Sequence, residues 1–225
     1  MLRITEIYPA VMGESRHSGW PCVIVRLTGC HRRCVYCDTA YAFQGGEDMS
    51  VDDVLDRVRS LGHGMLMVTG GEPLLQRDVV PLMARARQAG LSVVLETSGT
   101  RGVVVALDEV PAGVCRVVDV KTPGSGISAD QIDWDGLSGL GPDDEIKLVL
   151  SDHADYAWTR ELIGEGLAVD GRLRRLPRGV LVTVSPGWGA LAPRDLAAWV
   201  LRDRLPVRFQ VQLHKVVWPE AEGGV

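Results

Sequence analysis

The sequence has 225 residues, of which 46% are hydrophobic, so it is long enough to bury the core of one domain. Its formal net charge is −5 at pH 7, and its 24 lysines and arginines are scattered rather than gathered in a basic patch, which argues against nucleic-acid binding. No apolar run approaches the roughly 20 residues that cross a bilayer, and no signal-peptide pattern is evident at the N-terminus. We therefore expect a soluble, cytoplasmic protein with one domain over residues 1–225 and a flexible tail from about residue 219.

Short runs of β-branched residues alternate with segments of helical periodicity, a pattern typical of a parallel α/β sheet. The predicted strands cover residues 22–28, 65–69, 92–96, 116–120, 145–150, 180–184 and 207–212. The predicted helices cover residues 51–61, 78–89 and 153–164, and a fourth begins near Pro193. Seven strands are one fewer than a closed eight-fold barrel, which typically needs about 250 residues. We predict an incomplete, open (β/α) barrel of about six to seven mostly parallel strands; a doubly wound sheet has the same periodicity.

Polar residues follow the predicted strands at their carboxyl ends. In parallel α/β folds these ends meet at one edge of the sheet and form the active site. The polar segments are Cys30 and residues 69–72, 96–98, 119–121, 185–186 and 212–214. The sequence therefore predicts a site assembled from several strand ends.

Three of the five cysteines lie in one polar loop with the spacing C-x3-C-x2-C: Cys30, Cys34 and Cys37. Thiolates this close together can bind a soft or borderline metal. A four-iron cluster with one open iron needs three protein ligands, whereas a structural zinc site needs a fourth, from His31 or Cys22. Cys22 and Cys115 lie in apolar runs, so we expect them to be small, buried hydrophobic residues.

The cysteine spacing, with Tyr36 before the last cysteine, resembles the signature of the radical S-adenosylmethionine (SAM) superfamily. The segment Gly70-Gly71-Glu72-Pro73 follows a predicted strand, where radical SAM proteins contact the methionine amino group. Without the cysteine loop, this segment would indicate an ordinary turn. The resemblance implies a [4Fe–4S] cluster on the three cysteines whose open iron chelates SAM, and a 5′-deoxyadenosyl radical after reduction.

Further motifs, at residues 13–15, 19–21, 37–39, 96–99, 119–126, 145–147 and 212–215, extend over nearly the whole chain. Their order resembles the 7-carboxy-7-deazaguanine synthase family. The resemblance implies a ring-contracting carbon–nitrogen lyase that converts 6-carboxy-5,6,7,8-tetrahydropterin to 7-carboxy-7-deazaguanine and ammonia, for 7-deazapurines such as queuosine. It also implies Mg²⁺, a homodimer and an electron donor of flavodoxin or ferredoxin type.

The same resemblance implies a role for individual residues. Those expected around SAM are Tyr36, Gly71, Glu72, Glu96, Ser98, Asp119, Lys121 and Ser185. Those expected around the pterin are Val11, Met12, Gly13, Arg26, Thr69 and Trp218. Arg26 would clasp the substrate carboxylate, and Thr39 would be a ligand of Mg²⁺. For Lys121 and Lys147 a surface position is the alternative, and for His214 packing or a dimer contact is the alternative.

Two other functions fit parts of the pattern. A glycyl-radical-enzyme activase would share the cysteine spacing and the small size. A zinc-stabilised binding module would use the cysteines without catalysis. The arrangement of Gly13-Glu14 with Arg26 and the segments 145–147 and 212–215 fit the deazaguanine family better than the activase.

Overall fold

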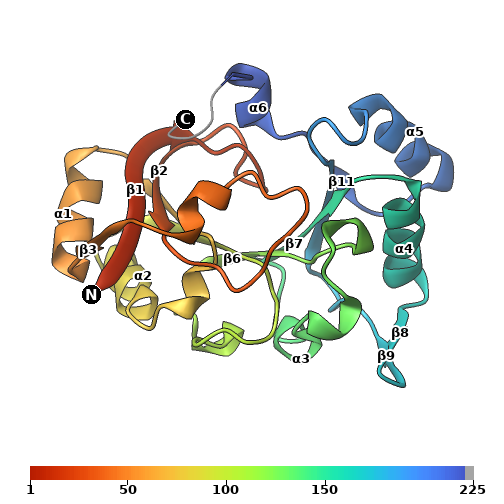
Figure 1. Ribbon diagram of the computed structural model, residues 1–225, viewed down its shortest axis with the longest axis horizontal. Coiled ribbons are helices and arrows are strands. Elements are labelled where there is room, and N and C mark those ends of the chain that lie inside the picture. Colours follow the sequence, from red (N-terminus) through yellow and green to blue (C-terminus); the bar gives the residue numbers. More distant parts are fainter. Residues whose placement is uncertain (221–225) are drawn as a thin grey trace.

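The computed structural model describes residues 1–220 and contains a curved, nine-stranded sheet with helices outside the curve (Figure 1). The strands, in spatial order, are β11 (Arg208–Phe209), β10 (Leu181–Pro186), β7 (Glu145–Leu150), β6 (Cys115–Asp119), β5 (Ser92–Thr97), β4 (Met65–Gly70), β2 (Pro21–Leu27), β1 (Leu2–Val11) and β3 (Glu47–Met49). Strands from β11 to β2 run parallel, and within residues 1–220 the two edge strands, β11 and β3, do not pair. The prediction of an open, mostly parallel barrel is confirmed.

Two strands at one edge of the sheet are missing from the prediction. β1 pairs antiparallel with β2, and β3 pairs antiparallel with β1. In β1 only Leu2 and Ile4 are fully buried, so the strand lacks the continuous apolar run of a central parallel strand. A separate hairpin of β8 (Leu167–Val169) and β9 (Arg172–Arg174) was also not predicted.

The last predicted strand is wrong beyond Phe209. β11 has only two residues, and the chain then turns into helix α6 (Leu213–Val217). His214 therefore lies on a short helix rather than at the end of a strand.

The four predicted helices are confirmed as α1 (Val51–Ser60), α2 (Val79–Gln88), α4 (His153–Gly164) and α5 (Pro193–Asp203). Ser50 caps α1 in a reciprocal pair with Asp53, and Gly90 follows α2 with a φ of +86°. The remaining helix is α3 (Trp134–Leu137). Short 3-10 turns cover Ala40–Phe43, Pro73–Leu75, Leu107–Glu109, Pro123–Ser125 and Ala129–Gln131. No helix within residues 1–220 has the length and apolar character of a membrane span.

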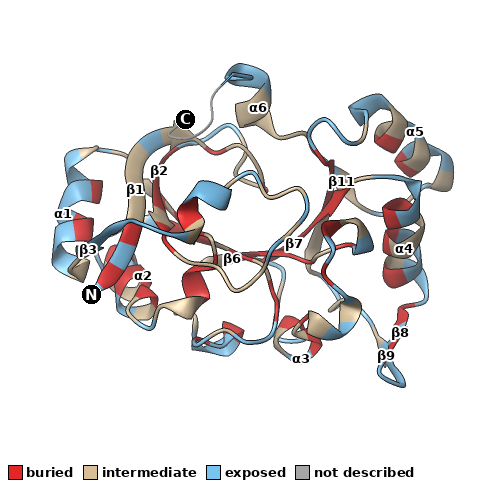
Figure 2. Cartoon of the chain, in the orientation of Figure 1, coloured by how far each residue is buried: buried red, intermediate tan, exposed pale blue. Residues whose placement is uncertain are grey.

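The two faces of β2 carry different side chains. Val23, Val25 and Leu27 belong to the main core, which includes the buried faces of the outer helices (Figure 2). Cys22 and Ile24 belong to a smaller apolar cluster, against which Cys115 is partly buried. Because successive residues of a strand point to opposite faces, Arg26 lies on the same face as Ile24. The prediction that Cys22 is a buried hydrophobic residue is confirmed.

The loop between β1 and β2 contacts β7 and β11, which are distant from β1 and β2 in the strand order. The backbone N–H of Arg16 donates to the buried carboxylate of Glu145 on β7, at 2.6 Å. Arg208 on β11 donates to the Ser15 carbonyl at 2.8 Å, and the N–H of Leu213 donates to the Gly13 carbonyl at 2.9 Å. The loop thus spans the concave side from β2 to β7 and β11.

Candidate active site

A cavity of about 310 Å³ lies at the carboxyl ends of the parallel strands. Its walls come from the β1–β2 loop, the cysteine loop, β2, β4, β5, β6 and β7, and the segment 212–215. The prediction that polar strand ends meet in one site is therefore confirmed. The following predicted site residues line the cavity: Val11, Gly13, Arg26, Cys30, Cys34, Tyr36, Cys37, Thr39, Thr69, Gly71, Glu96, Ser98, Asp119 and Lys121.

All three cysteines of the loop are half-buried free thiols on this cavity. Burial raises the pKa of the Cys30 and Cys34 thiols, so metal binding must displace protons from them. Within residues 1–220, no three His, Cys, Asp or Glu side chains form a group that could hold a single metal ion. A four-iron cluster does not require this convergence, because each thiolate binds a different iron.

The residues that a zinc site would need as a fourth ligand, His31 and Cys22, do not line the cavity. His31 Nε2 lies 3.0 Å from the Arg101 carbonyl and 3.1 Å from Thr100 Oγ1. Cys22 is fully buried in the small apolar cluster and does not line the cavity. The donor set of the cavity therefore fits a three-cysteine cluster better than a four-ligand zinc ion.

Gly71 must be glycine because the cysteine loop passes directly over it. A Cβ atom at Gly71 would lie 2.3 Å from the Gly29 carbonyl oxygen and 2.8 Å from Cys30 Cβ. The N–H of Glu72 donates to the same carbonyl at 2.8 Å. The strand end of β4 thus fixes the start of the cysteine loop.

Glu72 differs from the prediction. Its side chain is fully buried and accepts hydrogen bonds from Leu74, Thr97 and Ser98 instead of lining the cavity. The predicted contact between this carboxylate and SAM is therefore wrong. Ser185 is also buried and is not among the cavity residues.

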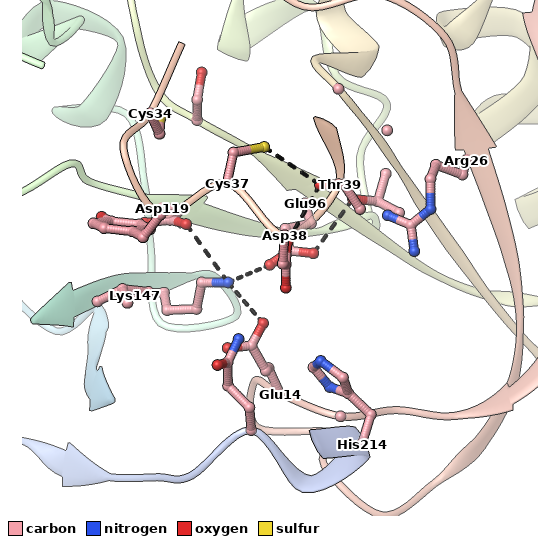
Figure 3. A pocket seen from close by; sticks show the side chains of 18 of the residues that line it. Glu14, Arg26, Cys34, Cys37, Asp38, Thr39, Glu96, Asp119, Lys147 and His214 are labelled. Atoms are coloured by element: carbon pink, nitrogen blue, oxygen red, sulfur yellow. Dashed lines mark hydrogen bonds and ion pairs between the residues drawn. The ribbon is translucent and has the colours of Figure 1, made fainter. Parts of the chain in front are cut away.

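Lys147 on β7 is 5% exposed and holds three carboxylates in the floor of the cavity (Figure 3). Its Nζ lies 2.9 Å from Glu14 Oε2 and 3.6 Å from Asp119 Oδ2, and it also donates to Glu96 Oε1. Asp119 pairs in addition with Lys121, at 2.7 Å. The surface alternative is wrong for Lys147, which is buried among these carboxylates, and for Lys121, whose side chain is 12% exposed and lies on the cavity beside Asp119.

Burial and these contacts shift the pKa values of the charged side chains in the floor of the cavity. Burial raises the pKa of Glu14 to about 7, although Lys147 opposes the shift. Burial works against a charged Lys147, yet Glu14, Glu96 and Asp119 together hold its pKa well above the usual value. Burial also disfavours charged Asp119, but Lys121 and Lys147 keep its pKa below the usual value. Glu14 was not among the predicted site residues; a lysine inside the apolar run of β7 was the signal that buried carboxylates must face it.

Arg26 lines the cavity with a guanidinium that is already anchored. Its Nε donates to Glu6 Oε1 at 2.6 Å, and its Nη2 lies 3.1 Å from the hydroxyl of Tyr8. Tyr41 donates to the same Glu6 oxygen at 2.8 Å. Thr69, the neighbour of Arg26 across β2 and β4, donates to Glu96 Oε2 at 3.3 Å. Arg26 is thus held in one orientation at the wall.

The β1–β2 loop and helix α6 meet at Gly13. A Cβ atom there would lie 2.0 Å from Nδ1 of His214, so only glycine permits this contact. His214 lines the cavity beside Lys215, and burial lowers the pKa of its imidazole. Thr39 also lines the cavity, with Oγ1 3.3 Å from Asp38 Oδ1 and 3.9 Å from Cys37 Sγ (Figure 3).

Two predicted pterin residues lie off the cavity. Met12 is 1% exposed in the small apolar cluster, and its N–H and carbonyl bond to Trp20 and Gly19 within the β1–β2 loop. Trp218 follows α6 and is 36% exposed, and it does not line the cavity. The sequence order alone could not show that Val11 and Gly13 face the cavity while Met12 faces the apolar cluster.

Comparisons with known proteins agree with this geometry. The family model of the radical SAM superfamily matches residues 24–119. The chain is 42% identical to 7-carboxy-7-deazaguanine synthase of Koribacter versatilis, over 99% of this chain and 100% of the relative. It is 39% identical to the protein of the same name from Chlorobaculum tepidum, over 99% and 97% of the two chains. The crystal structure of QueE from Escherichia coli has the same fold, with a TM-score of 0.68, 22% identity and coverage of 95% and 94%. These relatives give no support to a glycyl-radical-enzyme activase or a zinc-stabilised module.

Proposed function

Because the chain belongs to the 7-carboxy-7-deazaguanine synthase family of radical SAM enzymes, we propose that it converts 6-carboxy-5,6,7,8-tetrahydropterin to 7-carboxy-7-deazaguanine, with ring contraction and release of ammonia. The observation that carries the proposal is one cavity that joins three thiols to an anchored arginine and a floor of paired charges. A binding module without catalysis would need no such connection.

Cys30, Cys34 and Cys37 would hold the [4Fe–4S] cluster, and the residues beside them would hold SAM. When bound, the cluster and SAM supply a carbon radical that removes a hydrogen atom from the substrate. Gly71 lets the cysteine loop pack directly against the end of β4 beside the cofactor site, because any side chain there would overlap that loop. Asp119 Oδ1 is buried without a hydrogen-bond donor within residues 1–220, so it can accept a hydrogen bond from an N–H or O–H group of SAM.

The pterin would lie between Arg26, Thr69 and the charged floor. The guanidinium of Arg26 carries a fixed positive charge suited to the substrate carboxylate. Glu14 Oε1 is buried without a donor in the described part of the chain and can accept from an N–H group of the pterin ring. Lys147 donates hydrogen bonds to Glu14 and Glu96 and forms a longer ion pair with Asp119, so it orients these carboxylates around the substrate site.

Mg²⁺ would bind beside the cluster loop. Thr39 offers a hydroxyl oxygen, and Asp38 next to it offers a carboxylate, which are the oxygen donors that this ion prefers. The substrate carboxylate would complete the site. An electron donor of flavodoxin or ferredoxin type, a homodimer and a cytoplasmic location belong to the same proposal.

The decisive experiment is an anaerobic assay of protein whose cluster has been reconstituted. With SAM, a one-electron reductant, Mg²⁺ and carboxytetrahydropterin, we expect stoichiometric deazaguanine product and ammonia. The Cys34→Ala variant is the control for cluster-independent product. Intact iron and sulfide content together with SAM cleavage, but without deazaguanine product, would contradict the substrate and leave the radical SAM chemistry standing.

A further inference from the structure

The carboxylate of Glu72 is the centre of a hydrogen-bond network behind the cavity wall. Its Oε1 accepts from the N–H of Leu74 at 3.1 Å and from Thr97 Oγ1 at 2.7 Å. Its Oε2 accepts from Ser98 twice, from the N–H at 2.9 Å and from Oγ at 2.6 Å. An ionised carboxylate has about four acceptor positions, so four donors saturate it.

The network continues from Ser98 to the cysteine loop. Ser98 Oγ lies 2.8 Å from Thr100 Oγ1, which lies 3.1 Å from His31 Nε2. On the other side, the N–H of Glu72 donates to the Gly29 carbonyl at 2.8 Å. Gly29 and His31 are the two chain neighbours of Cys30. Glu72 is therefore connected to both of them, through its backbone and through its side chain.

The direction of each proton in this chain follows from the acceptors at its ends. The Arg101 carbonyl can only accept, so the His31 nitrogen that faces it, Nε2, carries the proton. That N–H also faces Thr100 Oγ1, whose own proton is then directed to Ser98 Oγ. The Ser98 proton is directed to the carboxylate. All donors thus point toward Glu72, and such aligned chains strengthen one another.

This alignment leaves the Ser98 hydroxyl with a free acceptor lone pair and no free donor. Its proton is committed to Glu72, so toward the cavity it can offer only a lone pair. It can accept a hydrogen bond from an ammonium or hydroxyl group of a ligand, but it cannot donate one to a ligand carboxylate.

We propose that Glu72 is a positioning residue: its buried carboxylate fixes Ser98 as a hydrogen-bond acceptor for SAM and, through Thr100 and His31, holds Cys30 in register with the SAM-binding end of β5. The inference rests on the proposed function, because it takes the ligand beside Ser98 to be SAM. It assigns the Glu72 side chain a role behind the site instead of a contact with the cofactor.

The first test is Glu72→Gln in anaerobically reconstituted protein. The amide keeps the volume of the side chain but replaces one acceptor by an N–H donor, which opposes the donors of Ser98. We expect SAM to bind roughly tenfold more weakly in equilibrium titration, a factor that corresponds to about 1.4 kcal/mol. We also expect an altered electron paramagnetic resonance spectrum of the reduced cluster when SAM is added, with iron and sulfide content retained.

The second variant, Thr100→Val, separates the effect of Glu72 on Ser98 from its effect on Cys30 through His31. It removes the hydroxyl that links Ser98 to His31 and leaves all four donors on Glu72 in place. We expect an altered spectrum of the reduced cluster and a smaller loss of SAM affinity than in Glu72→Gln. Because valine has nearly the shape of threonine, this variant also tests the network if Glu72→Gln does not fold.

The matched control is Asp144→Asn, which lies at the amino end of β7, away from the cavity. The Asp144 carboxylate is 4% exposed and also accepts four hydrogen bonds, three from Arg116 and one from the N–H of Gly141. A comparable fall in melting temperature with unchanged SAM affinity is expected for this control.

Equal behaviour of Glu72→Gln and Asp144→Asn, with lower stability but normal SAM affinity and spectra, would overturn the proposal. A wild-type protein that binds SAM but makes no deazaguanine would instead contradict the proposed substrate. In that case the binding and spectroscopic results would still decide the role of Glu72.

Discussion

The two sides of the cavity are built in different ways. The cysteine side is lined from within residues 30–37, 70–71 and 97–98, which are short segments of the sequence. The arginine side consists of Gly13, Glu14, Arg26, Lys147 and His214, which come from four separate places in the chain. Local motifs therefore suffice to define the cofactor side, whereas the substrate side exists only after long-range contacts have formed. Variants on the two sides should fail in different ways.

The largest effect is expected for Cys34→Ala on the cysteine side. Loss of one of three thiolates should abolish cluster assembly and SAM cleavage together, because the cluster has no other cysteine within reach in the described structure. Iron and sulfide analysis and an assay for 5′-deoxyadenosine would measure this. Cys22→Ala is the control and should cost only about 1 kcal/mol of packing energy. Loss of the cluster in Cys22→Ala, but not in Cys34→Ala, would refute the ligand assignment.

The second largest effect is expected for Gly71→Ala. The new methyl group would overlap the Gly29 carbonyl and Cys30 Cβ, so the cysteine loop must move. We expect SAM affinity to fall by at least roughly tenfold, as measured by equilibrium titration. Gly64→Ala is a matched control, since no atom lies within 4 Å of the position of its new methyl group. If both variants bind SAM like the wild type, the cofactor does not depend on this close approach.

Arg26→Gln tests the arginine side. Loss of a charge-assisted hydrogen bond to the substrate carboxylate should lower kcat/KM for the pterin by about 10- to 100-fold. SAM cleavage without pterin should stay near the wild-type rate, because Arg26 contacts Glu6 and Tyr8 rather than the cysteine loop. Steady-state kinetics and 5′-deoxyadenosine formation would be measured in parallel. Equal loss of both activities would remove the distinction between the two sides.

The smallest expected effect is a pH dependence of stability from Glu14. Its pKa is raised to about 7 by burial, so the folded state holds this proton more tightly than the unfolded state. The contribution to stability is therefore full below the unfolded pKa near 4.5 and is lost as the pH rises through about 7. Its slope is at most about 1.4 kcal/mol per pH unit.

Glu14→Gln should remove this slope, because the amide does not titrate. Urea denaturation of both proteins at several pH values between about 5 and 8 would measure the difference. A wild-type curve parallel to that of Glu14→Gln would mean that Glu14 does not titrate in this range.

The sequence by itself determined the parallel strands, the four long helices and the cysteine side of the cavity. Each depends on local patterns: apolar runs, helical periodicity, the capping residues Ser50 and Gly90, and three cysteines within eight residues. The identity of the cofactor was implied by the resemblance of the C-x3-C-x2-C spacing to the radical SAM signature.

Only the tertiary structure decided the rest. It showed that Glu72 turns into the protein, that Met12 leaves the cavity, and that Glu14 reaches Lys147 from a loop 133 residues away along the chain. These outcomes depend on which way a side chain points and on which charge can find a buried partner. A shift of one residue in a strand or loop turns a side chain to the opposite face. The free-energy cost of an unpaired buried charge determines which charged side chains become partners. Neither quantity can be calculated from residue spacing alone.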